Sequence, residues 1–342
     1  MQVVTTVPEI VKPGLEDRLA GMLVGALVGD AAGLGSHWIY NLEDLHKQFP
    51  EGLQGFDAPA EGHYHFGKEP GAFTHYGDAA LTVLKAVAEA GKGDPQAIGQ
   101  AWAAECMPQN GYQGYFDSAS RGTAETYFSW LDAGNSPEAY DWQQGADDDQ
   151  LATATSIAPV VAAHFQDPNW AGAIGLVTRV RQNNARAVAY NRVHGALLRE
   201  LLAGRDVHSA FHRVEAQLDG STEPLDLEIR RKLGEAFSLK HKSVAEATQV
   251  LGQSCPLLCS FPSAAHAAIR YPEDFKTCLL EILGAGGDNA GRAAIAGAWL
   301  GASLGLAQLP TDWVDRLNAK AEILKAAHSL ADKGAAGLET TD

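Results

Sequence analysis

Two apolar runs with regularly spaced glycines stand out in the pattern of hydrophobic and polar positions along the chain. The first covers residues 15–28, and the second covers residues 293–305. Glycine recurs at every fourth position, at Gly21, Gly25, Gly29 and Gly33 in and just after the first run and at Gly297, Gly301 and Gly305 in the second. Residues four apart share one face of a helix, so each run predicts a helix with a face of bare backbone. We expect these helices to form the core, each delivering an acidic loop to one pocket; close packing alone is the alternative interpretation.

Helical periodicity continues through the rest of the chain, and alternating β-branched stretches are almost absent. Gly91 and Gly204 end two of the expected helices, and Asp94 followed by Pro95 begins another. Further helices are expected over 78–90, 151–165, 185–202, 207–218, 226–239, 243–251, 262–270, 272–283 and 313–332, and the one over 151–165 is expected to be interrupted or to begin again at Pro159. The pattern predicts an all-α fold, a compact many-helix single domain over 1–342 with 1–12 as a loose N-terminal lead-in.

Polar segments rich in turn formers and aromatic residues interrupt this pattern at 29–40, 50–77 and 111–121. Long loops inside a compact domain are usually functional. Their aromatic rings can stack a base or a heteroaromatic aglycone, although a place in the core is the alternative for each of them. These rings belong to Trp38, Tyr40, Tyr64, Tyr76, Tyr112 and Phe116.

Composition narrows the possible partners. The chain has 342 residues, of which 46% are hydrophobic, and a net charge of −16. That charge argues against nucleic acid and anionic membranes as partners, because phosphate binding needs clustered Lys and Arg. The four cysteines have neither a metal-finger spacing nor a disulfide framework. Without an apparent signal peptide or an apolar run long enough to span a bilayer, we expect a cytoplasmic protein.

Four landmarks stand in a specific order along the chain. They are Gly-x-x-x-Gly-x-x-x-Gly-Asp-Ala-x-Gly at 21–33, Thr-His-Tyr-Gly-Asp at 74–78, an acidic loop before Pro159 and Gly-Gly-Asp at 286–288. This order resembles the ADP-ribosylglycohydrolase family over about residues 15–310. Together with His37-Trp38-Ile39-Tyr40, it looks like the branch that contains jellyfish J-crystallins and selenoprotein J. The resemblance implies a compact all-α domain whose two Mg²⁺ ions bind ribose hydroxyls and position the water that cleaves a glycosidic bond.

The chain departs from the family at its ligand motifs. Where the family has Thr-Asp-Asp-Thr, this chain reads Tyr76-Gly77-Asp78-Ala79, and where it has Asp-x-Asp-Thr, this chain reads Asp288-Asn289-Ala290-Gly291. A Glu often found seven residues after the first loop's Asp is His37 here. The cofactor is therefore expected to be at most one divalent metal ion, Mg²⁺ or another, on Asp78, Asp288 and His37, or none. A histidine ligand would favour Zn²⁺, Mn²⁺ or Fe²⁺ over Mg²⁺.

Asp78 and Asp288 are the predicted catalytic residues, as general base or as a metal ligand that orients water. Because each stands where a helix begins, a helix cap is the alternative role. Arg292 lies in the first turn of the last core helix, where a cation is unfavourable, so we expect it to pair with Asp78 or with a substrate anion. Asp30 is expected to hold loop amides. The substrate-binding candidates are His37, Trp38, Tyr76, Asp147, Asp148, Asp149 and Arg292, with a solvated loop as the alternative for the three consecutive aspartates.

The function that these residues favour is hydrolysis of a ribosyl-type N- or O-glycosidic bond. The expected partner is a small-molecule glycoside or an ADP-ribosyl substrate, and the sequence leaves the oligomeric state open. The alternative is a non-enzymatic, crystallin-like scaffold or a small-molecule binding protein.

Overall fold

The computed structural model describes residues 12–336, and within that range it contains sixteen α-helices, four short 3-10 helices and no β-strand. The predicted all-α class is confirmed. The 3-10 helices are Pro108–Asn110, Pro137–Ala139, Ala154–Ser156 and Leu306–Gln308. The α-helices are α1 Leu15–Gly33, α2 Leu42–Gln48, α3 His75–Ala90, α4 Pro95–Cys106, α5 Ser118–Asp132, α6 Ala158–Ala163, α7 Trp170–Arg181, α8 Ala185–Leu202, α9 Val207–Leu218, α10 Pro224–Ser238, α11 Val244–Leu251, α12 Leu257–Arg270, α13 Phe275–Gly284, α14 Asn289–Leu304, α15 Thr311–Asp315 and α16 Lys320–Ala336.

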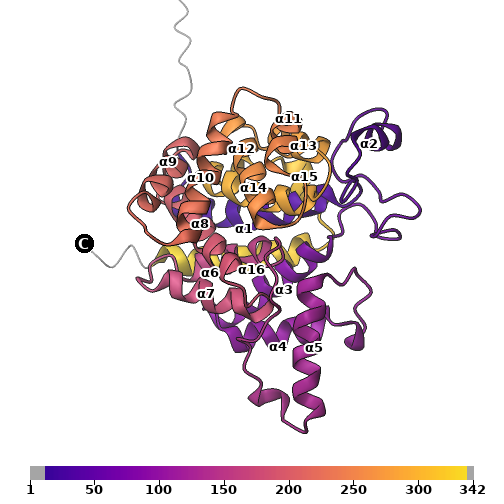
Figure 1. The fold of residues 1–342 in the computed structure, drawn as a ribbon, viewed down its shortest axis with the longest axis vertical. Coiled ribbons are helices and arrows are strands. Elements are labelled where there is room, and N and C mark those ends of the chain that lie inside the picture. Colours follow the sequence, from indigo (N-terminus) through magenta and orange to yellow (C-terminus); the bar gives the residue numbers. More distant parts are fainter. Residues whose placement is uncertain (1–11, 337–342) are drawn as a thin grey trace, which may run out of the picture.

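Helices α1 and α14 run through the middle of the molecule and pack antiparallel through their glycine faces (Figure 1). A Cβ atom added at Gly25 would lie 2.3 Å from the carbonyl oxygen of Gly297. One added at Gly301 would lie 2.0 Å from the carbonyl oxygen of Gly21. The two backbones therefore touch where no side chain fits. The predicted packing of the two glycine-faced helices is confirmed.

The other helices enclose this central pair. Helix α1 packs against α3, α6 and α16, and α14 packs against α8, α12 and α13 (Figure 1). Every residue of α1 from Leu19 to Gly33 is buried, as is every residue of α14 from Asn289 to Ala302. A helix that is buried on all sides needs no polar stripe, which explains why both runs are apolar at nearly every position.

Two helix ends near the candidate site differ from the prediction. Helix α1 continues to Gly33, so Asp30 lies inside the helix and not in a loop after it. Helix α3 begins at His75, and its N-cap is Thr74, whose side chain accepts the amide hydrogen of Tyr76. Threonine is a good N-cap residue, so the cap role considered for Asp78 belongs to Thr74.

Two predicted helical segments are interrupted, the first of them at Pro159 as predicted. The segment 151–165 forms only a 3-10 turn and the short α6, in which Pro159 stands near the start, where a missing amide hydrogen is tolerated. The segment 313–332 is divided between α15 and α16. The break contains the amide of Asn318, which donates to the carbonyl oxygen of Gly71 in the long loop and so cannot continue a helix.

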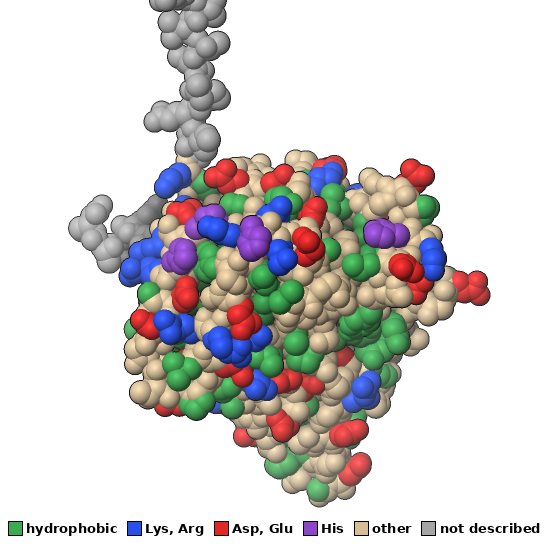
Figure 2. All heavy atoms as spheres, turned by 45° about the horizontal axis from the view of Figure 1, so that its top comes forward, with side chains coloured by type: hydrophobic (Ala, Val, Ile, Leu, Met, Phe, Trp, Pro, Cys, Tyr) green, Lys and Arg blue, Asp and Glu red, His purple; other side chains and the backbone are tan. Residues whose placement is uncertain are grey.

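Charged side chains are mixed over the molecular face seen in Figure 2. There, Lys and Arg side chains lie among Asp and Glu side chains without a continuous basic patch. This face therefore lacks the basic footprint that is typical of nucleic-acid binding. Among the helices of residues 12–336, none is both long and apolar enough to cross a membrane.

Candidate functional site

The C-terminal end of α1 meets the N-terminal ends of α3 and α14, and backbone hydrogen bonds join the loops there. The amide of Trp38 donates to the carbonyl oxygen of Gly287 at 2.8 Å, and the amide of Gly287 donates to Ile39 at 2.8 Å. Gly286 and Gly287 both have a φ of 66°, which glycine adopts without strain. These contacts fix the loop after α1 against the start of α14.

A cavity with a volume of about 330 Å³ opens beside this junction. Trp38 forms part of its wall, with a φ of 65° that is unusual for a bulky residue. The indole packs edge-on against Tyr64 and Tyr115, at centroid distances of 5.2 and 4.7 Å. The cavity thus offers aromatic faces to a planar ring. Its lining residues are Trp38, Tyr40, Tyr64, Tyr115, Asp117, Ser118, Arg121, Gln150 and Cys255.

Asp117 is the acidic residue among those that line the cavity, and it caps the start of α5. Its Oδ1 accepts the amide hydrogen of Ser120 at 2.7 Å, and its Oδ2 lies 3.6 Å from both Arg181 Nη2 and His75 Nε2. Burial raises the pKa of Asp117, but Arg181, His75 and Ser120 lower it more, so the net pKa is below the ordinary value. The carboxylate is therefore ionised at neutral pH. Sequence reasoning missed this residue, although an Asp after a polar loop is an N-cap signal.

Asp78 lies at the edge of the long loop and not among the residues that line the cavity. Its Oδ2 accepts hydrogen bonds from Lys68 Nζ at 2.6 Å and from the Tyr112 hydroxyl at 2.7 Å. Its side chain is 24% exposed. The ammonium group of Lys68 already balances this carboxylate.

Asp288 is fully buried behind the cavity. The Tyr76 hydroxyl donates to its Oδ2 at 3.1 Å, and its Oδ1 lies 3.7 Å from His37 Nδ1. Burial raises the pKa of Asp288 to about 6, while Cys255 and Arg292 oppose the shift. Among the contacts of residues 12–336, Asp78 and Asp288 have no hydrogen-bond partner in common.

The three consecutive aspartates make separate contacts. Asp147 is exposed, and Asp148 accepts a hydrogen bond from the Ser118 hydroxyl at 2.5 Å. Asp149 pairs with Arg186 Nη1 at 2.8 Å. The segment reaches the cavity at Gln150, which follows Asp149, and through the contact with Ser118; both Gln150 and Ser118 are lining residues.

Arg292 is buried and bonded to backbone rather than to Asp78. Its guanidinium donates to the carbonyl oxygen of Gln253 at 3.0 Å and to that of Gly286. Burial lowers the pKa of Arg292 to about 10, and Asp288 opposes that shift. The side chain therefore fastens two loops together behind the site.

The carboxylate set that would hold two Mg²⁺ ions does not fit this chain. A Cβ atom at Gly77 would lie 2.2 Å from Asp30 Oδ2. One at Gly291 would lie 2.7 Å from the Leu151 side chain and 3.0 Å from the Tyr76 ring. Neither position can carry an oxygen ligand without displacing these neighbours. The geometry supports no catalytic step through a pair of Mg²⁺ ions.

The carboxylate of Asp30 occupies the space beside Gly77. Its Oδ2 accepts the amide hydrogen of Thr74 at 2.8 Å, and its Oδ1 accepts the Thr74 hydroxyl. The prediction that Asp30 holds loop amides is confirmed. The same contact places its carboxylate against Gly77.

His37 lies beside two further histidines, His65 and His75. Sequence reasoning proposed His37 as a metal ligand with Asp78 and Asp288, and it missed the other two histidines. A signal was present, because His63, His65 and His75 all fall within or next to the long polar loop. Spacing alone did not indicate that this loop folds back onto the segment after α1.

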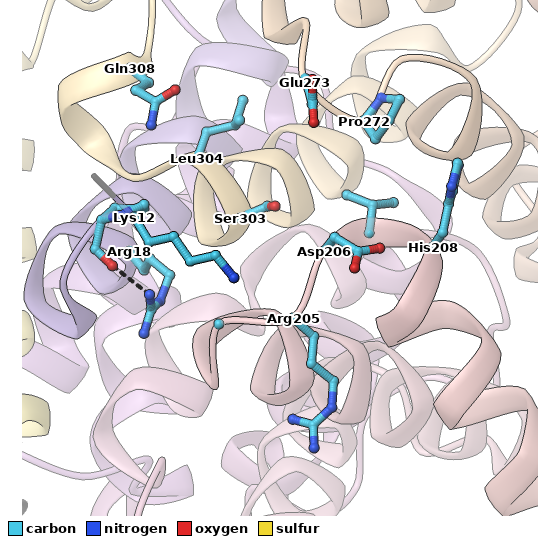
Figure 3. Close-up of a pocket in the computed structure, with 13 residues that line it drawn as sticks. Lys12, Arg18, Arg205, Asp206, His208, Pro272, Glu273, Ser303, Leu304 and Gln308 are labelled. Carbon is cyan, nitrogen blue, oxygen red and sulfur yellow. Dashed lines mark hydrogen bonds between the residues drawn. The ribbon is translucent and has the colours of Figure 1, made fainter. Parts of the chain in front are cut away.

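A larger cavity lies at the other end of the central helix pair, with a volume of about 450 Å³ (Figure 3). Arg18 and Ser303 line it, near the start of α1 and the end of α14. Arg18 donates to the carbonyl oxygens of Pro13 and Leu202, and Arg205 pairs with Glu200 at 3.0 Å. None of the residues predicted for the site lines this cavity.

Known proteins resemble this chain in sequence and fold. The family model described as ADP-ribosylglycohydrolase matches residues 11–338. Crystallin J1A of Tripedalia cystophora is 26% identical over 328 residues, which cover 92% of this chain and 97% of that protein. Crystallin J1B of the same organism is 24% identical over 322 residues, with the same coverage of 92% and 97%. A solved ADP-ribosylglycohydrolase-related protein complex has a TM-score of 0.72 at 20% identity, covering 94% of this chain and 99% of that chain, and so supports the fold.

Proposed function

The chain belongs to the ADP-ribosylglycohydrolase family, and on that premise we propose that it hydrolyses a ribosyl-type N- or O-glycosidic bond in the cavity beside α5. The substrate class is an ADP-ribosyl group or a related nucleoside-like glycoside. One observation carries the proposal: an aromatic-lined cavity of about 330 Å³ contains a buried, ionised carboxylate, that of Asp117. A cavity of this size suits a small molecule.

The cavity wall supplies groups for such a substrate. Trp38, Tyr64 and Tyr115 offer aromatic faces that can stack a base or a heteroaromatic aglycone. Arg121 is exposed at the rim, where it donates to the carbonyl oxygen of Phe116. Its other N–H groups can bind a phosphate or carboxylate of the substrate. An ADP-ribosyl substrate carries a diphosphate group, which would require such a cation for binding.

Asp117 is the proposed base. A glycosidic transition state carries positive charge on the sugar, which a nearby carboxylate stabilises while it takes a proton from water. Oδ1 is bonded to the Ser120 amide, whereas Oδ2 has no hydrogen-bond donor among the described residues. Oδ2 is therefore the atom that would accept the proton of the attacking water.

We propose positioning roles for the two carboxylates that the sequence favoured as catalytic. Asp78 holds Lys68 and Tyr112 at the edge of the long loop. Asp288 orients Tyr76 and lies beside His37. We assign them positioning roles because neither carboxylate is among the groups that line the cavity.

A comparison of two variants tests this assignment. With a panel of ribosides and an ADP-ribosylated peptide as substrates, Asp117→Asn is expected to lower kcat by roughly 10²–10⁴-fold, the usual contribution of a general base. Asp78→Asn is expected to lower it by about tenfold or less, because that residue acts through its neighbours. Circular dichroism on both variants controls for folding. Full activity in Asp117→Asn, or a larger loss in Asp78→Asn, would reject Asp117 as the base.

A second candidate function is a non-enzymatic scaffold or binding protein. Two observations favour it: the similar proteins are named crystallins, and side chains fill the space beside Gly77 and Gly291. Tryptophan fluorescence titration with nucleosides separates the possibilities, because Trp38 lines the cavity. Binding without turnover of any panel member would indicate a binding protein, and neither binding nor turnover would indicate a scaffold.

A further inference from the structure

We propose that His37, His65 and His75 bind one divalent transition-metal ion, for which Zn²⁺ is the best fit. One ring nitrogen of each histidine lies within 4.8 Å of a ring nitrogen of the other two. The three come from separate segments: the loop after α1, the long loop and the first turn of α3. This trio differs from the carboxylate set of the family motifs, and the proposal does not depend on the proposed hydrolase activity.

The three rings are buried, and most of their nitrogens have no partner. The exposed fractions of His37, His65 and His75 are 0%, 2% and 4%. Within the described residues, Nε2 of His37 and both ring nitrogens of His65 and of His75 form no hydrogen bond. Burying polar groups without partners destabilises a protein, and a ligand shared by the three rings would offset that cost. A metal ion satisfies one nitrogen from each ring at once.

Burial also keeps these imidazoles in the form that binds metals. It lowers the pKa of His65 to about 2 and that of His75 to about 4, in both cases with smaller effects from neighbouring charges. It places the pKa of His37 well below the ordinary value. Neutral imidazole is a common ligand for zinc, copper, nickel and iron, whereas Mg²⁺ prefers oxygen ligands.

The ring positions are close to those of a three-histidine site. The ring centroids are 5.6 Å apart for His37 and His65, 6.0 Å for His37 and His75, and 5.8 Å for His65 and His75. Zinc–nitrogen bonds of about 2.0–2.1 Å at tetrahedral angles place ligand nitrogens roughly 3.4 Å apart. The ring nitrogens, which lie within 4.8 Å of one another, would have to approach to about that spacing. The ring of His65, nearly parallel to those of His37 and His75 at 24° and 20°, would have to turn so that the three nitrogens converge on one ion.

Carboxylates stand behind two of the three rings. Nδ1 of His37 accepts the amide hydrogen of Ala290 at 3.4 Å and lies 3.7 Å from Asp288 Oδ1, while Nε2 has no partner among the described residues. Nε2 of His75 lies 3.6 Å from Asp117 Oδ2, which is too far for a hydrogen bond, so this oxygen stays free for the role proposed above and His75 offers Nδ1 to the metal. In metal sites a ligating histidine usually donates its other ring N–H to a carboxylate, whereas the two distances here are those of charge contacts, longer than a hydrogen bond. The two carboxylates can also balance the charge of a buried divalent ion.

His63 supports the trio without belonging to it. Its Nε2 donates to the carbonyl oxygen of His37 at 2.7 Å, and its Nδ1 accepts the amide hydrogen of His65 at 3.1 Å. One ring thus ties the backbones of two of the proposed ligands together. Such bracing is expected where ligands come from loops that lack regular structure.

Trp38 separates the trio from the cavity. Its indole stacks on His37 at a centroid distance of 4.3 Å and lies 5.1 Å from the ring of His75, while it also lines the cavity. We therefore assign the ion a structural role, in which it holds the long loop against α1 and α3. Tyr64 and Trp38, which form part of the cavity wall, are positioned by the same segments.

Metal analysis of the full chain tests the proposal. After incubation with Zn²⁺ and dialysis, the wild-type protein is expected to retain one zinc ion per chain, and Mg²⁺ is not expected to compete. His65→Asn and His75→Asn are expected to weaken zinc binding by roughly 100-fold or more, since each removes a ligand. The control is His212→Asn, which alters a side chain that is 63% exposed and should bind zinc like the wild type.

A spectroscopic measurement on the wild-type protein covers the case in which the variants do not fold. X-ray absorption of the zinc-loaded chain is expected to show a first shell with three imidazoles. Bound Cu²⁺ should quench Trp38 fluorescence, measured as the difference from Trp38→Phe, because the indole stacks on a ligand ring. No retained zinc, a shell with fewer than three imidazoles, or unchanged zinc binding in both folded ligand variants would overturn the site.

Discussion

Three buried carboxylates lie near one end of the central helix pair, and their surroundings divide them into different protonation states. Burial raises the pKa of Asp30 to about 7 and that of Asp288 to about 6, with neighbouring donors opposing each shift. For Asp117, the cation of Arg181 and its other neighbours outweigh burial, so its pKa falls. Neighbouring titratable groups with pKa values shifted in opposite directions are typical of sites that use one group as a base. It agrees with Asp117 as the proposed base.

Asp30 predicts a pH dependence of stability. A carboxyl group whose pKa is higher in the folded than in the unfolded chain binds its proton more tightly when folded. Between the ordinary aspartate pKa of 3.8 and the folded pKa of about 7, the unfolding free energy should therefore fall as pH rises. The total decrease from this group is on the order of 4 kcal/mol. Asp30→Asn does not titrate and should remove this contribution.

Urea unfolding at several pH values between 4 and 7.5 measures the effect. The wild-type free energy of unfolding is expected to decline more steeply with pH than that of Asp30→Asn. The difference between the two proteins isolates Asp30 from other titrating groups, including Asp288. Parallel curves would show that Asp30 is ionised in the folded chain at all of these pH values.

At the scale of elements, the glycine faces explain why α1 and α14 can be buried together. A residue larger than glycine at the contact would push the helices apart, because a Cβ at Gly25 would meet a carbonyl oxygen at 2.3 Å. Glycine lowers helix propensity by about 1 kcal/mol relative to alanine. The close contact offsets this cost through dispersion between the two backbones.

Alanine substitution separates the two effects. Gly25→Ala is expected to destabilise the protein by roughly 1–3 kcal/mol through overpacking. The matched control is Gly234→Ala in α10, where the Cβ would meet only Glu215 Oε1 at 3.4 Å. That change should stabilise the protein by about 0.5–1 kcal/mol through helix propensity. Thermal unfolding of both variants measures the contrast, and equal shifts would argue against a tight contact at Gly25.

At the scale of the whole molecule, segments distant in sequence share one core. Helix α1 packs against α14 and α16, both in the last part of the chain. Helix α16 also packs against α3 and α6. Because α1 ends at Gly33 and α14 begins at Asn289, any continuous fragment that contains both central helices also contains all the residues between them.

This arrangement predicts one cooperative unfolding transition, as expected for a single domain. Calorimetry on the full chain should give one peak with equal calorimetric and van't Hoff enthalpies. Loss of α1 would expose the glycine face of α14, so neither half can keep its core alone. Two resolved peaks would show instead that the chain contains separately folding units.

The sequence by itself determined the all-α class and the central helix pair. Apolar periodicity and the four-residue spacing of Gly21, Gly25, Gly297 and Gly301 are local properties that survive in any tertiary context. The helix start at Asp94 is also a local property, and the Asp94 side chain accepts hydrogen bonds as the N-cap of α4. The ordered motifs also indicated the family, because they extend over most of the chain.

Only the tertiary structure decided which polar side chains meet. Asp117 lines the cavity because α5 begins there, and His65 reaches His37 because an aperiodic loop folds back onto the end of α1. On α3, Tyr76 bonds to Asp288 whereas Asp78 bonds to Lys68, because side chains two residues apart on a helix point to different sides. Local pattern carries no information about contacts between distant loops, nor about the burial that shifts each pKa.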